Sequence, residues 1–470
     1  MKKSIFKFAS ITPFLFGLSS LLYTPLSMAD ETGDLIEKGR YIAIAADCAA
    51  CHKSADEKEA PFSGGYKIAS PMGGIVASNI TPSKEFGIGN WSEKQFSDAV
   101  RKGISANGEY LYPAMPYTSY YRISDDDIHA LYTYFMHGVT PFDRATMDKT
   151  DLDFPFNMRN LMWGWNIIYA NNQTAVSDQN RSLELNRGQY LVDALAHCST
   201  CHTPRNMMMA EDKNQYLAGS LLGGWYAPNI TSDKESGIGN WSQQDIAIYL
   251  KTGHVANKAQ AAGPMGEAVS MSFRFMTDDD LNAIAAAIKE VPAIKTEIAK
   301  QNATTPVPVP NINEVVIGQS DQNSLITSTT INGAELYNGA CASCHGIEGQ
   351  GTTDSFYPSL TQNSTVNNFS PNNLVMTISE GIHRPGNDID VFMPAFGKEL
   401  NNGQIASVSN YVRLHFGNID DKLTKNDVLL IRQGGEAPFL LKYINWLMAG
   451  GGIIGLIILW GIFRTFKRRH

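Results

Sequence analysis

Apolar residues along most of the chain recur at the three-to-four-residue spacing of amphipathic helices. One such segment begins at a capping serine and ends at a glycine eleven residues later, and it occurs three times, over 92–103, 242–253 and 370–381. Later helices are expected over 124–138, 277–291 and 401–416. In each copy an earlier helix, marked by a glycine and a nearby tyrosine, should pack across the later one; the marking residues are Gly39 and Tyr41, Gly188 and Tyr190, and Gly333 and Tyr337. The periodicity predicts an all-α fold.

The two ends of the chain carry longer apolar runs. Residues 1–29 hold three lysines, an apolar run over 11–23 and the small-residue sequence Ser27-Met28-Ala29. They predict a secretory signal peptide, with a short N-terminal membrane helix as the alternative. Residues 444–463 predict one C-terminal transmembrane helix, with a buried core helix as the alternative. The basic residues that follow should stay in the cytoplasm, which predicts an inner-membrane protein whose main body lies in the periplasm.

The internal repeat extends beyond the helices. The sequence GIGNWS occupies 87–92 and 237–242, and Asn-Ile-Thr occurs at 79–81 and 229–231, at the same offset of 150 residues. The motif Cys-x-x-Cys-His occurs three times, at 48–52, 198–202 and 341–345. Such a repeat predicts three tandem copies of one small domain, over 30–145, 182–299 and 325–420. Residues 146–182 and 300–328 would join them.

Composition agrees with ordinary folded domains and excludes one class of partner. The chain has 470 residues, of which 43% are apolar, enough for about three domains of roughly 150 residues. It carries 46 acidic residues against 38 basic ones. Because nucleic-acid binding requires a basic face, no nucleic-acid partner is expected.

All six cysteines lie in the three Cys-x-x-Cys-His motifs. Disulfides, thiol–disulfide exchange and zinc binding are alternative uses of such pairs. A histidine directly after every pair favours covalent haem c, because two sulfurs on one helical turn can reach two vinyl groups while the histidine binds the iron. The motifs predict three covalent haems, attached through Cys48, Cys51, Cys198, Cys201, Cys341 and Cys344, with His52, His202 and His345 as iron ligands.

The second axial position of each iron also has a candidate ligand in the repeat. The residue 23 positions after the capping serine is a methionine in all three copies, namely Met115, Met265 and Met393. Met271 and Met276 are alternatives in the second copy. Histidine–methionine ligation fills the iron and suits electron transfer. The sequence has no nucleotide-binding fingerprint and no Ser-His-Asp arrangement, so no substrate-oxidising site is expected on this chain.

Two further features concern the surroundings of the haems. Asn79 and Asn229, together with the indole N–H groups of Trp91 and Trp241, are candidate donors to haem carboxylates, since buried carboxylates need hydrogen-bond donors. The aromatic stretch over 160–170 is expected to pack between the first two domains, with a docking surface for a partner as the alternative.

The three Cys-x-x-Cys-His domains, the sequences GIGNWS, GPMGEA and MPAFG, and the C-terminal apolar run resemble the trihaem cytochrome c subunit of membrane-bound periplasmic dehydrogenases. That family serves gluconate, sorbitol, fructose, aldehyde and alcohol dehydrogenases. The resemblance implies the same three ligand pairs as the spacing, namely His52 with Met115, His202 with Met265, and His345 with Met393.

The resemblance also implies partners. They are a dehydrogenase catalytic subunit that is a flavoprotein or a pyrroloquinoline-quinone (PQQ) protein, a small third subunit, and ubiquinone as the electron acceptor. The favoured interpretation is an electron-transfer subunit for a gluconate-type flavoprotein. The alternatives are the cytochrome subunit of a PQQ alcohol dehydrogenase, a cytochrome c subunit of a terminal oxidase, and a periplasmic haem reductase.

Overall fold

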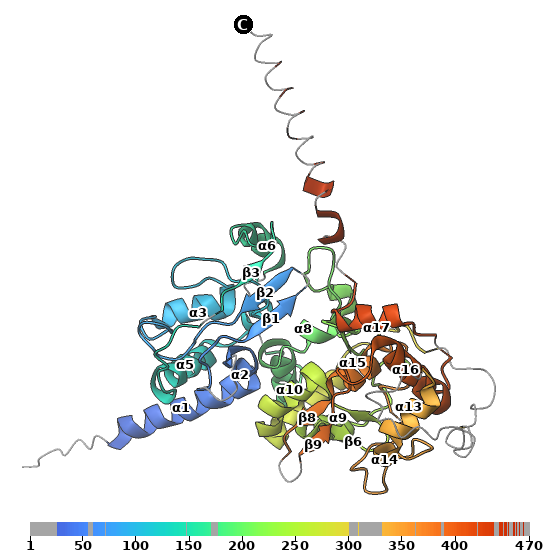
Figure 1. The fold of residues 1–470 in the computed structure, drawn as a ribbon. Helices are drawn as coiled ribbons and strands as arrows, with labels where there is room; N and C mark the ends of the chain where they lie inside the picture. The colour runs from blue at the N-terminus through green and yellow to red at the C-terminus, as the bar shows by residue number, and fades with distance from the viewer. Residues whose placement is uncertain are drawn as a thin grey trace, which may run out of the picture.

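Three helical units follow one another along the chain in the computed structural model (Figure 1). It describes residues 26–54, 60–70, 72–146, 148–170, 177–299, 309, 331–361, 363–386, 390–420 and 422–436, and beyond these 441–444, 446–448, 450, 455, 457, 460 and 464. We refer to the three units as domains 1, 2 and 3.

The helices divide among the domains as follows. Domain 1 contains α1 (Leu26–Ala45), α2 (Cys48–His52), α3 (Glu93–Lys102), α4 (Tyr117–Tyr120), α5 (Asp125–Thr133) and the π-helix η1 (Tyr134–Gly138). Domain 2 contains α7 (Leu183–Tyr190), η2 (Leu191–Leu195), α8 (Ser199–His202), η3 (Lys213–Gln215), α9 (Gln243–Thr252), α10 (Gly263–Met271), η4 (Phe273–Phe275) and α11 (Asp278–Glu290). Domain 3 contains α13 (Gly333–Ala340), α14 (Ala342–His345), α15 (Asn372–Glu380), α16 (Asn402–Gly417) and α17 (Lys425–Arg432).

In every domain the first helix crosses a later helix at a glycine, as the sequence predicts, and these later helices are α5, α11 and α16. A Cβ atom added to Gly39 in α1 would lie 2.0 Å from the carbonyl oxygen of Ala130 in α5. An added Cβ atom would lie 1.9 Å from the carbonyl oxygen of Ala283 at Gly188, and 2.4 Å from the carbonyl oxygen of Ser407 at Gly333. Only glycine leaves room for such a close backbone approach. The later helices begin directly after the expected caps, Ser124, Thr277 and Asn401.

The prediction of an all-α fold is wrong, because the described residues also form four small antiparallel sheets. They are β1 (Lys67–Ser70), β2 (Gly73–Val76) and β3 (Asp151–Leu152); β4 (Ser220–Leu222) and β5 (Trp225–Ala227); β6 (His254–Val255) and β7 (Ala259–Gln260); and β8 (Ile382–Arg384) and β9 (Val391–Met393). Hairpins turn at Gly73 and at Gly223-Gly224, with φ between 55° and 116°, where glycine is favoured. A Gly-Gly pair between short apolar runs is a hairpin signal that the helical periodicity does not contain.

The predicted transmembrane helix over 444–463 is also contradicted. Among the described residues, no helix has both the length and the apolar character needed to cross a membrane. The inner-membrane location with a single C-terminal span therefore loses its basis. Most of 444–463, and residues 1–25 of the predicted signal peptide 1–29, lie outside the described residues.

Domains 1 and 2 share one hydrophobic core, whereas domain 3 has a core of its own. Charged and aromatic pairs close the boundary between domains 1 and 2. Lys53 forms an ion pair with Glu267, and Arg122 forms one with Asp193 at 2.8 Å. The ring of His197 lies edge-on to Tyr120, with centroids 5.5 Å apart. These contacts hold the first two domains in one fixed arrangement.

The joining segment between domains 1 and 2 is structured. It supplies β3 and α6 (Leu161–Tyr169). Trp165 of α6 is buried, and its indole N–H donates to the carbonyl oxygen of Met208 in domain 2 at 2.8 Å. Tyr117 of domain 1 donates to the side chain of Asn166 at 2.8 Å. The expected packing of this aromatic helix between the domains is thus confirmed, while Trp163 on the same helix is 60% exposed.

Candidate haem sites

Each Cys-x-x-Cys-His motif forms one short helical turn after the first helix of its domain, in α2, α8 and α14. The backbone N–H of His202 donates to the carbonyl oxygen of Cys198 at 3.0 Å, and His345 donates to Cys341 at the same distance. One turn therefore presents two thiols and an imidazole from neighbouring positions. All six cysteines are free and partly buried.

The three motif histidines share one orientation. The Nδ1 atoms of His52, His202 and His345 lie 2.7, 2.7 and 3.0 Å from the carbonyl oxygens of Ser78, Pro228 and Pro358. A carbonyl oxygen only accepts, so Nδ1 carries the proton and Nε2 keeps a free lone pair. Burial lowers the pKa of all three rings, which keeps them neutral. This second hydrogen bond is typical of a histidine that binds a metal, so the donor set fits a haem iron in each domain.

The alternative uses of the cysteines fit less well. Burial raises the pKa of the Cys48, Cys198 and Cys341 thiols to about 12. Thiol–disulfide exchange requires the opposite shift, because the thiolate is the reactive form. Within the described ranges, no three or more His, Cys, Asp or Glu side chains are grouped so that they could hold a metal ion. The motif geometry thus favours haem over a zinc site.

A helix follows the motif in each domain, as predicted. Ser92 and Ser242 cap α3 and α9 through complete capping boxes. The predicted serine cap is wrong in the third copy, because Pro371 is the N-cap residue of α15 and makes no side-chain cap hydrogen bond. The helices end at Gly103, Gly253 and Gly381, whose φ angles are 62°, 71° and 72°. A side chain would be strained at these angles, which explains the glycine in all three copies.

The glycine at the end of each helix also fixes the loop that follows. The carbonyl oxygen of Gly103 accepts from Leu111 N–H at 2.8 Å, and that of Gly253 accepts from Ala261 N–H at 2.8 Å. Each bond lies four residues before the candidate methionine, Met115 or Met265. In domain 3, a Cβ atom on Gly381 would lie 2.4 Å from the carbonyl oxygen of Met393. The constant serine-to-methionine spacing therefore follows from a glycine that touches the methionine loop.

The candidate methionines occupy different local structures. Met115 lies in the loop before α4 and Met265 in α10, and both pack against the same core as Cys48 and Cys198. Met393 ends β9, opposite Ile382 of β8, and Cys341 packs against the core of domain 3. Of the alternatives in domain 2, Met271 ends α10.

Met276, the other alternative, is only 1% exposed and is a full member of the core of domains 1 and 2. The described position of Met276 thus fits a packing residue.

The two asparagines proposed as donors to haem carboxylates have other partners. The Asn79 side chain donates to the carbonyl oxygen of Phe142 at 2.9 Å and accepts from Thr81. Asn229 donates to Ile294 at 2.7 Å and accepts from Thr231. Both amides tie the turn before the capped helix to the segment that follows the last helix, so the repeated asparagine is structural.

The three candidate sites adjoin one another through α10. This helix carries Met265, and it contacts α2, which is the motif turn of domain 1, as well as β8 in domain 3. Figure 1 shows α10 between α2 and the β8–β9 hairpin. The repeat contains no signal for these contacts, because a residue such as Glu267 is not repeated: the other copies have Tyr117 and Ala395 at that position.

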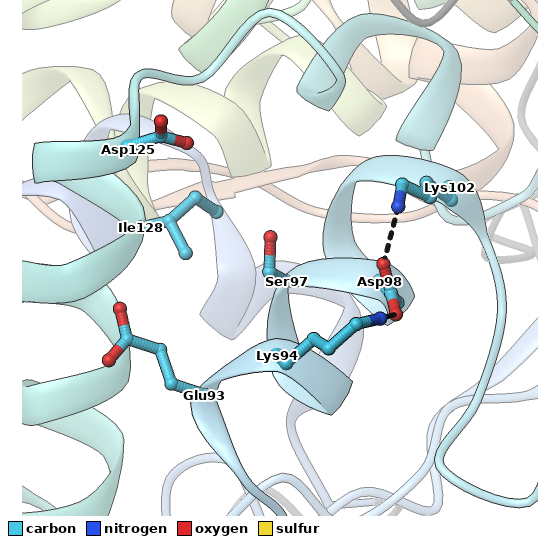
Figure 2. A pocket seen from close by; sticks show the side chains of 7 residues that line it. All are labelled: Glu93, Lys94, Ser97, Asp98, Lys102, Asp125 and Ile128. Carbon is cyan, nitrogen blue, oxygen red and sulfur yellow. Dashed lines mark hydrogen bonds and ion pairs between the residues drawn. The ribbon is translucent and has the colours of Figure 1, made fainter.

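A surface pocket on domain 1 holds none of the candidate haem residues. It lies between α3 and α5, and Asp98 at its edge pairs with Lys94 at 2.5 Å and Lys102 at 2.7 Å (Figure 2). These ion pairs are on the outer face of the domain, where surface pairs contribute little to stability.

Comparison with known families identifies the domain type at both ends of the chain. The family described as "Cytochrome c" matches residues 36–138. The family described as "Cytochrome C oxidase, cbb3-type, subunit III" matches residues 329–412. Each match covers one domain, and each contains one Cys-x-x-Cys-His motif.

Individual relatives, unlike the two family models, align with almost the whole chain. A fructose dehydrogenase cytochrome subunit from Gluconobacter japonicus is 44% identical over 92% of this chain and 92% of its own length. The cytochrome c subunit of an alcohol dehydrogenase (quinone) from Komagataeibacter europaeus is 36% identical over 93% of this chain and 91% of the relative. A gluconate 2-dehydrogenase cytochrome c subunit from Pantoea cypripedii is 35% identical over 88% of this chain and 93% of its own length.

The motif turns, the oriented histidines and these full-length relatives agree with one another. The chain carries covalently bound haem c and transfers electrons from a dehydrogenase partner. It belongs to the family of cytochrome c subunits of fructose, alcohol and gluconate dehydrogenases.

Proposed function

We propose that this chain is a three-haem subunit that takes electrons from a sugar- or sugar-acid-oxidising flavoprotein and delivers them to ubiquinone. The proposal includes three cytochrome c domains over 30–145, 182–299 and 325–420. Each domain holds one haem through its two motif cysteines. The proposed iron ligands are His52 and Met115, His202 and Met265, and His345 and Met393.

The position of α10 carries this proposal. The helix with Met265 contacts the motif turn of domain 1 and the hairpin that ends at Met393 in domain 3. A haem in domain 2 would therefore have a neighbouring haem site on either side. Such an arrangement suits a relay of single electrons through one chain.

The residues of the chain have defined roles in such a relay. Haem c supplies reversible one-electron iron chemistry when it is bound. The carbonyl oxygens of Ser78, Pro228 and Pro358 orient the three imidazoles. Met115, Met265 and Met393 would hold the irons together with these histidines, and full axial ligation by protein residues suits electron transfer rather than substrate binding at the metal. Substrate oxidation is therefore assigned to the partner subunit.

The relatives support the choice of partner and acceptor. Identity is 44% to the fructose dehydrogenase subunit and 36% to an alcohol dehydrogenase subunit, which favours a sugar-oxidising partner. The names of the alcohol dehydrogenase relatives include a quinone, which supports a quinone acceptor. A small third subunit is proposed from the family resemblance. A PQQ alcohol dehydrogenase is the second candidate for the partner.

Purification of the tagged chain from its own host, together with its bound subunits, tests the function. We expect a co-purifying dehydrogenase subunit with flavin, reduction of the haem absorption bands by fructose or gluconate, and reduction of a soluble ubiquinone analogue. PQQ in the partner and reduction by ethanol would select the second candidate. A chain that binds no dehydrogenase subunit, or whose haems no sugar or alcohol reduces, would overturn the proposal.

A separate measurement tests the number of haems. The intact mass of the mature chain should correspond to three covalent haems, and no free thiol should react with an alkylating reagent. Changing both cysteines of one motif to alanine, for example Cys341→Ala with Cys344→Ala, should remove one haem and leave two. A wild-type mass with fewer than three haems contradicts the assignment.

A further inference from the structure

Arg384 belongs to domain 3, but its side chain is buried against domain 2. The residue ends β8 and is 2% exposed. Its Nη1 atom donates to the carbonyl oxygen of Ala261 at 2.6 Å. A Cβ atom on Gly253 would lie 2.6 Å from the Arg384 Nε atom. The glycine that ends α9 therefore also makes room for the guanidinium group.

This buried cation has no anion within the described protein. The Arg384 Nη2 atom is buried and has no hydrogen-bond partner among the described residues. The ionisable side chains that interact electrostatically with Arg384 are Tyr249 and His254. Burial raises the pKa of Tyr249 to about 12 and lowers that of His254, so both are neutral near pH 7. Buried charges in proteins are normally paired, and the described residues supply no anionic partner for Arg384.

The guanidinium group lies at the part of domain 2 that bears the candidate haem ligands. Tyr249 and Ala261 belong to, or pack against, the same core as Cys198 and Met265. Ala261, which accepts from Arg384, comes four residues before Met265. The helix that carries Met265, α10, contacts β8, which carries Arg384. The anion that completes this pair should thus come from the haem region of domain 2.

We propose that Arg384 is the counter-ion of a haem propionate in domain 2, supplied by domain 3 across the domain boundary. This inference rests on the haem ligation proposed above. A propionate is the only carboxylate that a bound haem brings into a buried region, and a guanidinium group matches a carboxylate with two parallel N–H donors. Arg384 is then a positioning residue, and the docking of domain 3 completes the haem site of domain 2.

The reduction potentials of the three haems in the full chain, measured by spectroelectrochemistry, provide the test. In Arg384→Gln, loss of the cation should favour the oxidised haem and shift one reduction equilibrium about tenfold, which is about 59 mV for a one-electron couple. That potential should also become pH-dependent near neutrality, because an unpaired propionate takes up a proton more readily. Arg384→Lys should retain most of the wild-type potential.

Arg274 provides a matched control. Its Nη1 atom donates to the carbonyl oxygen of Pro385 at 2.5 Å, so it also bonds across the boundary between domains 2 and 3. Arg274→Gln should leave all three potentials unchanged. Unchanged potentials in Arg384→Gln, or an equal change in Arg274→Gln, would overturn the proposal. Arg384→Gln could lose the haem of domain 2 altogether. In that case normal haem content in Arg384→Lys supports the role of the charge, and equal haem loss in both variants overturns that role.

A third pair of variants identifies the affected haem. Since β8 pairs with β9, the strand of Met393, the propionate could also come from the haem of domain 3. Met265→His and Met393→His should each displace one potential, marking the haems of domains 2 and 3. We expect Arg384→Gln to shift the same reduction potential that Met265→His displaces. If it shifts the potential that Met393→His displaces, the propionate does not belong to the haem of domain 2. If Met265→His displaces no potential while Arg384→Gln still does, the proposed ligation fails and the counter-ion role stands.

Discussion

The phenol of Tyr41 in domain 1 donates a 2.7 Å hydrogen bond to the carboxylate of Asp280 in domain 2. The contact is reciprocal, because Tyr190 in domain 2 donates to Asp127 in domain 1, also at 2.7 Å. Both tyrosines lie in the first helix of their domain, and both aspartates lie in the first turn of the last helix. Domains 1 and 2 therefore face each other with approximate two-fold symmetry, as the subunits of a homodimer do.

Removing both phenols should weaken the coupling of the two domains. Tyr41→Phe and Tyr190→Phe each lose one hydrogen bond to a charged group, at a cost of about 1.5–3 kcal/mol. By calorimetry, we expect domains 1 and 2 of the wild type to unfold together, and those of the double variant to unfold in two separate thermal transitions. Tyr132→Phe is the control, because its phenol donates to Trp91 within domain 1 at 2.8 Å. A single transition in the double variant would contradict a role of these pairs in domain coupling.

The pair around Asp280 also predicts a pH dependence. Burial by itself raises the pKa of Asp280, but hydrogen bonds from Arg187 and Tyr41 outweigh it and the pKa is lowered. Stabilisation from a carboxylate with a lowered pKa is complete above its unfolded-state pKa of about 3.9, and it is lost as the pH falls through the folded-state pKa.

We therefore expect the Tm to fall below about pH 4, and to fall less steeply in Asp280→Asn. The exposed neighbour Asp279 provides the control, because Asp279→Asn should leave the slope of Tm against pH as in the wild type. Equal slopes for all three proteins would show that Asp280 does not contribute.

The helix crossings predict a strong dependence on side-chain size. Gly39→Ala would place a methyl group 2.0 Å from the carbonyl oxygen of Ala130, so the helices must separate. We expect a loss of about 1–3 kcal/mol in the free energy of unfolding. Gly33 lies in the same helix with no atom within 4 Å of an added Cβ. Gly33→Ala should be neutral or stabilising by up to about 1 kcal/mol. Urea unfolding distinguishes the two, and equal effects would contradict the crossing.

The distal ligand in domain 2 can be separated from its alternatives. Met265→Leu should remove one methionine–iron charge-transfer band and lower one reduction potential. Met276→Ala should keep that band, and because Met276 is 1% exposed it should destabilise the domain by about 2–5 kcal/mol. Visible spectra and thermal unfolding of both variants give the answer. If Met265→Leu keeps the band and Met276→Ala or Met271→Leu loses it, the iron ligand is the methionine whose substitution removes the band.

Features that repeat in the sequence could be predicted, because each copy is an independent test of the same local rule. The serine caps of α3 and α9, the glycines at helix ends and the helix crossings all follow from short-range geometry, and they lie where the spacing puts them. The motif turns are equally local. Asn79 shows the limit of this reasoning, since repetition marks a residue as important without saying whether it serves the fold or a cofactor.

Contacts between domains could not be predicted, because they join residues with no fixed spacing. Arg384 contacts Ala261 only after two domains have docked, and the residues at the same distance from the serine in the other copies are Ala106 and Ala256. The hairpins were missed for another reason: strands of two to four residues are too short to establish a period. The apolar run over 444–463 predicts a span from composition alone, whereas no helix among the described residues is long and apolar enough to cross a membrane.

The two-fold relation between domains 1 and 2 has a consequence for how such a protein can diverge. In a true homodimer every substitution at the interface occurs twice, so both haem sites change together. Here the residue before the first motif cysteine is Asp47 in one copy and His197 in the other, both with positive φ. Because both copies lie in one chain, each can differ in sequence from its twin. Such a chain can place an acid beside one proposed haem site and an imidazole beside the next, which no identical pair of subunits could do.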